Sequence, residues 1–255
     1  MTINLEIQRF NPETDAAPSF KTYRVDANPT DRVLDALMEI KRNQDGSLAF
    51  RKSCAHGVCG SDAMVINGKE RLACKTLMRD VAETDGATVR IEPARHQEVQ
   101  RDLMVRQDLF FDNYRSVKPF FMANEEKRPA VGEFIQTQGE RAEIDDATKC
   151  ILCGACYSAC PVLDENLNFI GPAAIVQAAR WVFDSRDRGL VGRLDVLDQP
   201  DGVWPCENHF ECTRVCPREI KVTKLINFTK RAIKKHREDQ GEPVNDGTGA
   251  ASEHS

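Results

Sequence analysis

The spacing of its cysteines restricts the fold of this 255-residue chain more than any other feature. One run follows the pattern C-x2-C-x2-C-x3-C and ends in Cys160-Pro161. A second run ends in Cys216-Pro217 and repeats that spacing, except that His209 stands where a cysteine would fall. A third, more open group lies within residues 54–74. Thiols grouped in this way need either shared metal ligation or a set of disulfides to hold them.

The first run has the spacing that holds iron–sulfur clusters in bacterial two-cluster ferredoxins. Zinc is the main alternative, but zinc sites favour C-x2-C pairs separated by a spacer and do not call for the proline. Disulfides are a weaker alternative, because residues 1–10 have neither the basic start nor the apolar core of a signal peptide. We therefore expect the chain to stay in a reducing cytoplasm and to use its cysteines as iron ligands.

In two-cluster ferredoxins the fourth cysteine of each run binds the cluster of the other run. This rule assigns a complete [4Fe–4S] ligand set to Cys150, Cys153, Cys156 and Cys216. The other set consists of Cys160, Cys206 and Cys212. Three thiolates predict a [3Fe–4S] cluster, which lacks one iron. The alternative is that His209 ligates a fourth iron, because imidazole can bind this metal.

The third group has the plant-type spacing of a [2Fe–2S] site, with a carboxylate replacing one cysteine. A carboxylate is a harder donor than a thiolate and changes the potential of the cluster. The alternative is that this carboxylate lies behind the ligands or in solvent. Gly57 and Gly60 allow backbone N–H groups to point at the cluster. The predicted ligands of this cluster are Cys54, Cys59, Asp62 and Cys74.

The pattern of apolar residues divides the chain into two parts. Residues 1–95 mix strands with a helix, and Asn67-Gly68 is typical of a hairpin turn. Residues 96–237 have mostly helical spacing, although we expect the polar stretch 127–146 to cross the surface as a loop. Residues 238–255 are polar and are predicted to be disordered.

Further motifs accompany the cysteine runs: Arg51-Lys-Ser-Cys54-Ala-His-Gly-Val-Cys59-Gly-Ser-Asp62, Phe169-Ile-Gly-Pro-Ala173 and Asp184-Ser-Arg-Asp187. Together they resemble the iron–sulfur subunit of succinate dehydrogenase and quinol:fumarate reductase, from about residue 3 to residue 236. The resemblance implies an α+β chain in which a β-grasp [2Fe–2S] ferredoxin-like domain precedes an all-α two-cluster ferredoxin domain. It also implies that electrons pass from a flavoprotein subunit carrying FAD, through [2Fe–2S], [4Fe–4S] and [3Fe–4S] clusters, to membrane quinone. Aspartate at the position of Asp62 and a non-cysteine residue at that of His209 also occur in this family.

One segment departs from the family pattern. Many members carry a tryptophan after the Cys-Pro pair that contacts quinone, whereas this chain has Asp164 and Glu165 there. Trp204 is a candidate replacement, and ordinary packing is its alternative role. A titratable group beside the last cluster would help to move protons to reduced quinone. The candidate quinone contacts are Pro161, Trp204 and His209.

The chain lacks parts that the whole reaction needs. It has no G-x-G-x-x-G motif for a dinucleotide and no run of about 18 apolar residues to span a membrane. We therefore expect no catalytic residue in this chain, a flavoprotein partner, and membrane-anchor partners that hold it at the cytoplasmic face of the inner membrane. A net charge of −5 gives no electrostatic reason to expect nucleic acid.

The last helix is rich in lysine and arginine, which suits either anionic lipid headgroups or a solvated face. Two other functions remain open from the residues. The chain could belong to a fumarate reductase or another flavin-dependent dehydrogenase, or it could be a zinc-stapled interaction module without redox activity.

Overall fold

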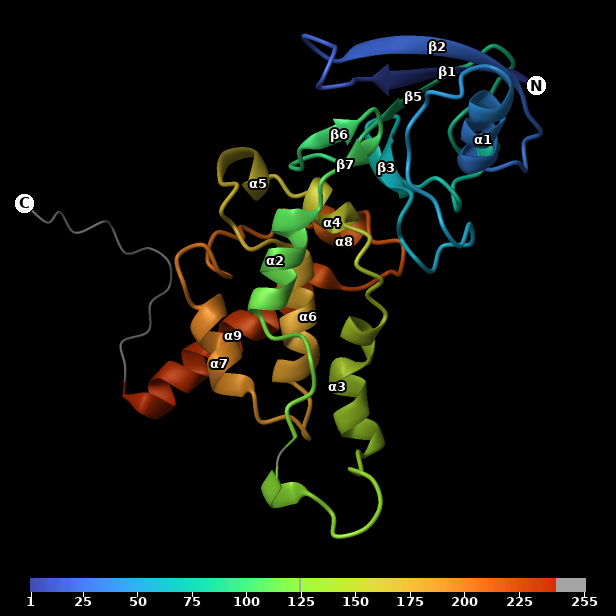
Figure 1. The fold of residues 1–255 in the computed structure, drawn as a ribbon. Helices are drawn as coiled ribbons and strands as arrows, with labels where there is room; N and C mark the ends of the chain where they lie inside the picture. Colours follow the sequence, from blue (N-terminus) through green and yellow to red (C-terminus); the bar gives the residue numbers. More distant parts are fainter. Residues whose placement is uncertain (124, 242–255) are drawn as a thin grey trace, which may run out of the picture. The chain divides into compact units, whose positions relative to one another are not determined.

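The computed structural model describes residues 1–123 and 125–241 and divides the chain into two compact units (Figure 1). The first unit contains Met1–Leu109 together with two later segments, Ile151–Ala159 and Arg214–Glu219. The second unit contains Phe110–Cys150, Cys160–Thr213 and the chain from Ile220 onward. Both cysteine runs are therefore divided between the units, and the third cysteine group lies entirely in the first.

A five-stranded mixed sheet forms the first unit, in the order β2-β1-β5-β3-β4. Strands β1 and β5 pair in parallel, and the other pairs are antiparallel. The strands are β1 (Thr2–Arg9), β2 (Ser19–Asp26), β3 (Ala63–Ile66), β4 (Lys69–Leu72) and β5 (Thr88–Glu92). A separate hairpin is formed by β6 (Val99–Arg101) and β7 (Met104–Val105). Helix α1 (Val33–Asn43) and a 3-10 turn, η1 (Met78–Asp80), complete this part of the chain.

Local sequence explains these elements well. Ile3, Leu5 and Ile7 alternate along β1 and are fully buried, because successive strand residues point to opposite faces. In the β3–β4 hairpin, Asn67 (φ 49°) and Gly68 (φ 76°) both adopt the left-handed conformation that a type I′ turn requires. The predicted hairpin turn is therefore confirmed.

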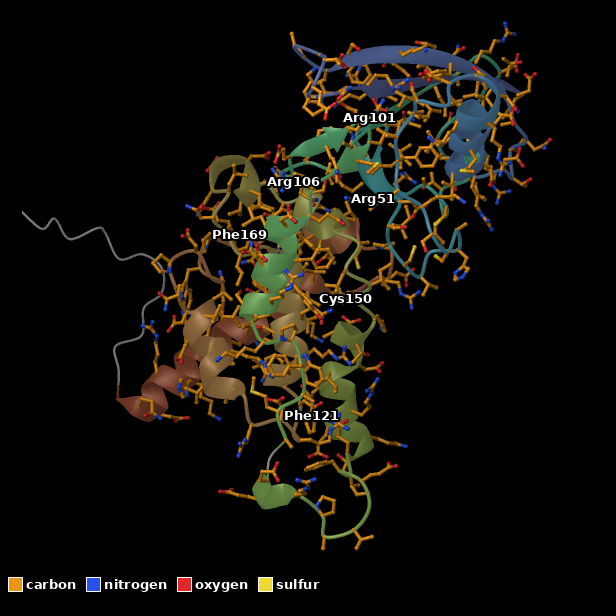
Figure 2. The ribbon with its side chains drawn as sticks, in the orientation of Figure 1. Arg51, Arg101, Arg106, Phe121, Cys150 and Phe169 are labelled. Atoms are coloured by element: carbon orange, nitrogen blue, oxygen red, sulfur yellow. The ribbon has the colours of Figure 1, made fainter. Side chains whose placement is uncertain are left out.

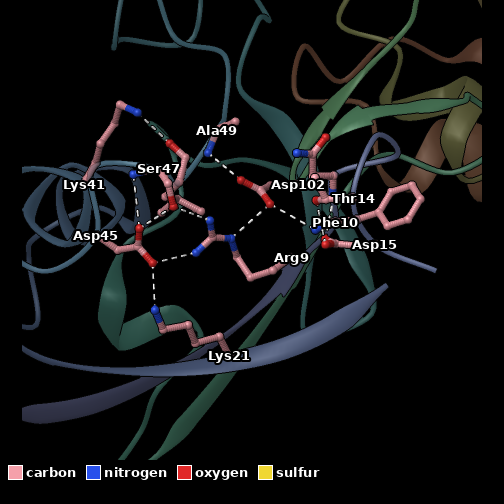
Figure 3. Close-up of polar contacts among 12 residues, drawn as sticks. Arg9, Phe10, Thr14, Asp15, Lys21, Lys41, Asp45, Ser47, Ala49 and Asp102 are labelled. Carbon is pink, nitrogen blue, oxygen red and sulfur yellow. Dashed lines mark hydrogen bonds and ion pairs between the residues drawn. The ribbon is translucent and has the colours of Figure 1, made fainter. Parts of the chain in front are cut away.

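A partly buried polar network connects β1 with the β6–β7 hairpin and the chain that leads to the first cysteine loop (Figure 3). Arg9 Nε donates to Asp102 Oδ1 at 3.0 Å, and the Ala49 amide donates to Asp102 Oδ2 at 2.8 Å. Arg9 also donates to Asp45 at 2.8 Å. Hydrogen bonds from Lys21 and other donors hold the pKa of Asp45 well below its usual range.

Helices form the second unit. Helix α6 is its centre, with residues 172–179 all buried, and it packs against α3, α7 and α9. The helices of this part are α2 (Asp108–Ser116), which begins in the first unit, α3 (Gln138–Thr148), α5 (Val162–Glu165), α6 (Pro172–Val182), α7 (Leu190–Leu197), α8 (Glu211–Arg214) and α9 (Val222–Gln240). A 3-10 turn, η2, covers Glu125–Lys127. None of the described helices is both long and apolar enough to cross a bilayer.

Helix α3 corrects one prediction, because the polar stretch 127–146 was expected to be a loop. Thr137 and Glu140 form a capping box: the Thr137 hydroxyl accepts the Glu140 amide at 3.2 Å, and the Glu140 carboxylate accepts the Thr137 amide at 2.8 Å. Only Ile144 and Ala147 are buried, so the helix has a weak apolar pattern. Helix α9 extends to Gln240, into the predicted tail, and residues 242–255 lie outside the described residues.

An enclosed ion pair stabilises the second unit. Arg193 and Asp187 have fully buried side chains, with Nη1 and Oδ1 2.5 Å apart. Arg193 also donates to the carbonyl oxygens of Lys118 and Phe120, and Asp187 accepts the amide of Met122 at 2.8 Å. Because both charges are fully hydrogen-bonded, the pair fixes the segment 118–122 against α7.

Candidate metal centres

The first cysteine loop, residues 54–62, is built so that backbone amides face its thiols. The amides of His56 and Cys59 approach Cys54 Sγ at 3.5 and 3.3 Å. Hydrogen bonds from these amides lower the pKa of Cys54 to about 6, and the His56 amide has the largest effect. A thiolate is the form that ligates metal, so the loop favours the ligating form of Cys54.

Left-handed backbone lets the loop curl tightly. Ala55 (φ 59°), Gly57 (φ 79°) and Gly60 (φ 69°) all have positive φ. A Cβ added to Gly60 would lie 2.5 Å from Cys153 Cβ and 2.8 Å from Cys153 Cα. Gly60 therefore lets this loop touch the run that carries the predicted [4Fe–4S] ligands, within the first unit. At its start the loop is held by Arg51, which donates to the Val105 carbonyl of β7 at 2.6 Å (Figure 2).

Asp62 is the unusual member of the predicted [2Fe–2S] set. Its side chain is 3% exposed, and Oδ2 accepts the Cys74 amide at 2.6 Å. The other oxygen, Oδ1, is buried and has no hydrogen-bond partner among the described residues. A buried carboxylate oxygen without a partner is costly unless a cation or donor compensates it, so this donor set fits an iron ligand.

The remaining thiol of this group lies beside Asp62. Cys74 is 1% exposed. Its burial is the main cause that raises its pKa to about 12, and the neighbouring Asp62 carboxylate adds to the shift. The Gly57 amide donates to the same thiol, and Cys54 is close enough to contribute to the shift. The structure thus brings together the predicted ligands Cys54, Cys59, Asp62 and Cys74, whereas His56 is exposed. Bound iron would favour the ionised form of a thiol that burial alone keeps protonated.

The predicted [4Fe–4S] cysteines lie on two segments of the first unit and at the end of one segment of the second. Cys153 and Cys156 belong to Ile151–Ala159, Cys216 belongs to Arg214–Glu219, and Cys150 immediately precedes Ile151. Leu152 (φ 54°) and Gly154 (φ 77°) turn the chain into the single-turn helix α4 (Ala155–Ser158). This curled backbone resembles that of the first loop.

Helix α4 is anchored on the sheet of the first unit. The Ser158 hydroxyl donates to Glu70 Oε1 of β4 at 3.0 Å and accepts the Arg95 amide at 2.8 Å. Ser158 is 1% exposed and Glu70 is 7% exposed. This buried, satisfied contact fixes the thiol run next to the sheet that carries the first loop.

The third set lies wholly in the second unit and lines one hollow. Burial raises the pKa of Cys160 to about 11, and the neighbouring thiols Cys206 and Cys212 add to the shift. Burial also raises the pKa of Cys212, and the Thr223 hydroxyl opposes this. The hollow is lined by the three cysteines together with Pro161, Val162, Phe169, Pro172, His209, Phe210, Glu211, Thr223 and Ile226.

The three candidate quinone contacts are not all at this hollow. Pro161 and His209 line it, and His209 Nε2 lies 3.5 Å from a carboxylate oxygen of Glu207. Trp204 is absent from its lining; its indole N–H donates to Asp198 Oδ1 at 2.9 Å. The indole N–H of Trp204 therefore already has an acceptor.

None of the ten cysteines, all of which lie in the described chain, forms a disulfide. Within the same residues, no three His, Cys, Asp or Glu side chains are close enough to hold a single metal ion. A polynuclear cluster has a different geometry, because its cysteines bind different irons. The thiol-rich loops, the unpartnered Asp62 oxygen and the buried thiols together fit such clusters.

Sequence reasoning missed two hydroxyls at these sites. Ser61 Oγ lies 3.1 Å from Cys59 Sγ, and Thr223 Oγ1 lies 3.5 Å from Cys212 Sγ. Ser61 lies between Cys59 and Asp62 in the first motif, so its position next to two predicted ligands could have identified it. Thr223 is separated from Cys212 by 11 positions, and no spacing rule connects them.

Comparisons with known proteins agree with this geometry. The family described as a 2Fe-2S iron-sulfur cluster binding domain matches residues 4–112, and the 4Fe-4S dicluster domain family matches residues 146–220. The fumarate reductase iron-sulfur subunit of Mycobacterium tuberculosis (strain CDC 1551 / Oshkosh) is 40% identical, covering 92% of this chain and 94% of that protein. The subunit of the same name from Haemophilus influenzae (strain ATCC 51907 / DSM 11121 / KW20 / Rd) is 37% identical, covering 89% and 91%.

A solved structure gives the same result. A chain of the Mycobacterium smegmatis Sdh1 complex in the apo form superposes with a TM-score of 0.82 at 28% identity, covering 96% of this chain and 99% of that one. The predicted α+β fold class, with a [2Fe–2S] domain before a [4Fe–4S] domain, is confirmed. This chain belongs to the family of iron–sulfur subunits of succinate dehydrogenase and fumarate reductase, and it is the electron-transfer subunit of such an oxidoreductase.

Proposed function

We propose that this subunit carries electrons from FAD on a flavoprotein partner, through [2Fe–2S] and [4Fe–4S] clusters, to a [3Fe–4S] cluster that reduces membrane quinone. The observation that carries this proposal is the hollow where three buried or half-buried thiols, and no fourth cysteine, meet apolar walls. A site with three thiolates suits a cluster with three irons. The ligand sets are those expected from the spacing, with Asp62 on the first cluster.

Two observations support a sequential path. Gly60, in the first loop, touches Cys153 of the second set, so the first two clusters would be neighbours within the first unit. Cys156 and Cys160, from the second and third sets, are four positions apart, and such a stretch spans at most about 14 Å. The covalent chain therefore keeps these two ligands close whatever their surroundings.

The quinone would approach the third cluster from the side of Pro161 and His209. A quinone ring needs apolar walls and one or two hydrogen-bonding groups, which Pro161 and His209 supply. The indole N–H of Trp204 is already bonded to Asp198, so Trp204 would not donate to the quinone. Its role would be to pack near Cys206, two residues further along the chain. Membrane-anchor partners would hold this chain at the cytoplasmic face of the membrane.

The names of the relatives favour a second candidate, in which flux runs toward fumarate. The relatives from M. tuberculosis and H. influenzae are both named as fumarate reductase subunits. In that case electrons would enter at the third cluster from quinol and leave at the flavin. Measuring succinate–quinone and quinol–fumarate turnover on the purified complex decides between the two directions.

An electron paramagnetic resonance (EPR) experiment tests the cluster assignment. The air-oxidised complex is expected to show the signal of a three-iron cluster, and dithionite reduction should reveal the other two. Iron analysis should give about nine irons per chain. A colourless protein containing zinc would refute the proposal entirely. If the third site instead gives a four-iron signal that is lost in His209→Ala, only the assignment of the third cluster changes, to a [4Fe–4S] cluster with His209 as a ligand.

A further inference from the structure

Two threonine hydroxyls lie beside the third thiol set, and one of them, that of Thr223, belongs to a residue that lines the same hollow. Thr223 is in the first turn of α9 and is 2% exposed. Its Oγ1 lies 3.5 Å from Cys212 Sγ and 3.0 Å from the Oγ1 of Thr213 in α8. The Thr223 amide donates to the same Thr213 oxygen at 3.0 Å.

One assignment of the hydroxyl protons satisfies all of these contacts. Cys212 has no proton when it ligates iron, so its sulfur can only accept. Thr213 Oγ1 accepts the Thr223 amide, and we assign the Thr213 hydroxyl proton to Thr223 Oγ1. The Thr223 proton is then directed at Cys212 Sγ. The backbone amide of Thr213 also donates to Cys212 Sγ, so this sulfur accepts from a second donor on α8.

We propose that the Thr223 hydroxyl, supported by Thr213, donates to the iron-bound sulfur of Cys212 and raises the reduction potential of the third cluster. This inference rests on the proposed assignment of Cys160, Cys206 and Cys212 to that cluster. The physical reason is that one-electron reduction adds negative charge to the cluster and its sulfurs. A hydrogen bond to a ligand sulfur therefore stabilises the reduced state more than the oxidised state.

The surroundings make this contact effective. Cys212 is buried, and apolar residues, including Phe169, Pro172 and Ile226, line the same hollow. A hydrogen bond is electrostatically stronger in such an environment than in water. Thr223 thus acts on the cluster through the Cys212 sulfur.

Thr223→Val removes the hydroxyl at nearly constant volume, and Thr223→Ser retains it. Thr229→Val is a matched control, because Thr229 is a fully buried threonine of α9 whose hydroxyl donates only to the Leu225 carbonyl, at 2.9 Å. The experiment is an EPR-monitored redox titration of each cluster in the purified complex. It reports the midpoint potential separately from the amount of cluster and from turnover.

Thr223→Val is expected to lower the equilibrium constant for reducing the third cluster roughly three- to tenfold, where tenfold corresponds to about 59 mV for one electron. The [2Fe–2S] and [4Fe–4S] midpoints should not change. Thr223→Ser should stay near wild type, and Thr229→Val should leave the midpoint unchanged. Thr213→Val should shift it in the same direction by less.

An unchanged midpoint in Thr223→Val with a full cluster signal would overturn the inference. An equal shift in Thr229→Val would overturn it too, because the effect would then be one of packing. If Thr223→Val fails to assemble the cluster, Thr213→Val decides, and an unshifted midpoint there counts against the inference. Absence of the three-iron signal in the oxidised wild type would instead refute the proposed cluster type, so the two failures are distinguishable.

Discussion

The loop thiols of the first cluster site and the buried thiols of the third use the same donor atom in opposite electrostatic surroundings. In the first loop Cys59 is exposed, Val58 is 56% exposed, and backbone amides hold the pKa of Cys54 at about 6. At the third site Cys160 and Cys212 are buried, and burial raises the pKa of Cys160 to about 11. The Cys54 thiolate is thus stabilised by backbone amides of its loop, whereas the buried thiols of the third site depend on iron and on side-chain hydroxyls.

This difference has a consequence for tolerance to mutation. A loop that depends on backbone amides is sensitive to any change that alters its φ angles or its close approach to Cys153. A hollow that depends on side chains is sensitive to packing and to the helices that hold it. The first site should therefore fail through its glycines, and the third through the interior of the second unit.

The largest expected effect comes from Gly60→Ala. The added Cβ would lie 2.8 Å from a backbone atom of Cys153, at a φ of 69°. We expect loss of the [2Fe–2S] signal, disturbance of the [4Fe–4S] signal and retention of the third cluster, as measured by EPR. Gly68→Ala is the control: its φ is 76° but nothing lies within 4 Å, so only about 1–2 kcal/mol of backbone strain is expected. Loss of the third cluster alone would contradict the comparison.

Next in size is Asp187→Asn, which acts on the interior of the second unit. Removing the charge leaves Arg193 buried without its partner, which costs about 3–5 kcal/mol. Denaturant unfolding followed by circular dichroism should show this loss. The control, Asp145→Asn, removes an exposed pair with Arg141 and should cost about 0.3–0.5 kcal/mol. Equal losses in the two variants would mean that burial of the pair does not matter.

A smaller effect is expected from Asp62→Cys at the first site. A thiolate replaces a carboxylate, so the [2Fe–2S] cluster should assemble and its midpoint potential should shift, while the other clusters keep theirs. Redox titration followed by EPR measures both outcomes. An unshifted midpoint in a fully assembled variant would mean that Asp62 is not a ligand. Asp62→Ala should reduce [2Fe–2S] occupancy, since it also removes the acceptor of the Cys74 amide.

The smallest effect is a difference in pH dependence after iron is removed. The lowered pKa of Cys54 means that folded protein loses this proton before unfolded protein does, so stability rises with pH from about 6 to the ordinary thiol value. The raised pKa of Cys160 has the opposite sign, and its contribution is lost as pH rises toward about 11. Iodoacetamide labelling with mass spectrometry should find Cys54 modified near neutral pH and Cys160 protected. If Cys54 and Cys160 are labelled at comparable rates, the predicted difference between their pKa values is wrong.

Sequence alone determined the ligands that could be proposed. The cysteine spacings, with Asp62 and His209 at the two irregular positions, identify three groups because a cluster loop requires donors at short, fixed separations. Alternation in β1 and the Asn67-Gly68 turn predicted local structure in the same way, through backbone geometry that depends on near neighbours. Helix α3 was not predicted from the sequence, because its capping box lies in a polar stretch and only two of its residues are buried.

Tertiary structure alone decided which groups surround the ligands. The approach of Gly60 to Cys153, the unpartnered oxygen of Asp62 and the hydrogen bond of Trp204 to Asp198 involve residues that no motif connects. Thr223 reaches Cys212 only because α8 and α9 meet at the third site. The spacing of nearby residues is enough to predict which residues are ligands. The reduction potential of a cluster depends on contacts between distant segments, and these contacts exist only once the chain has packed.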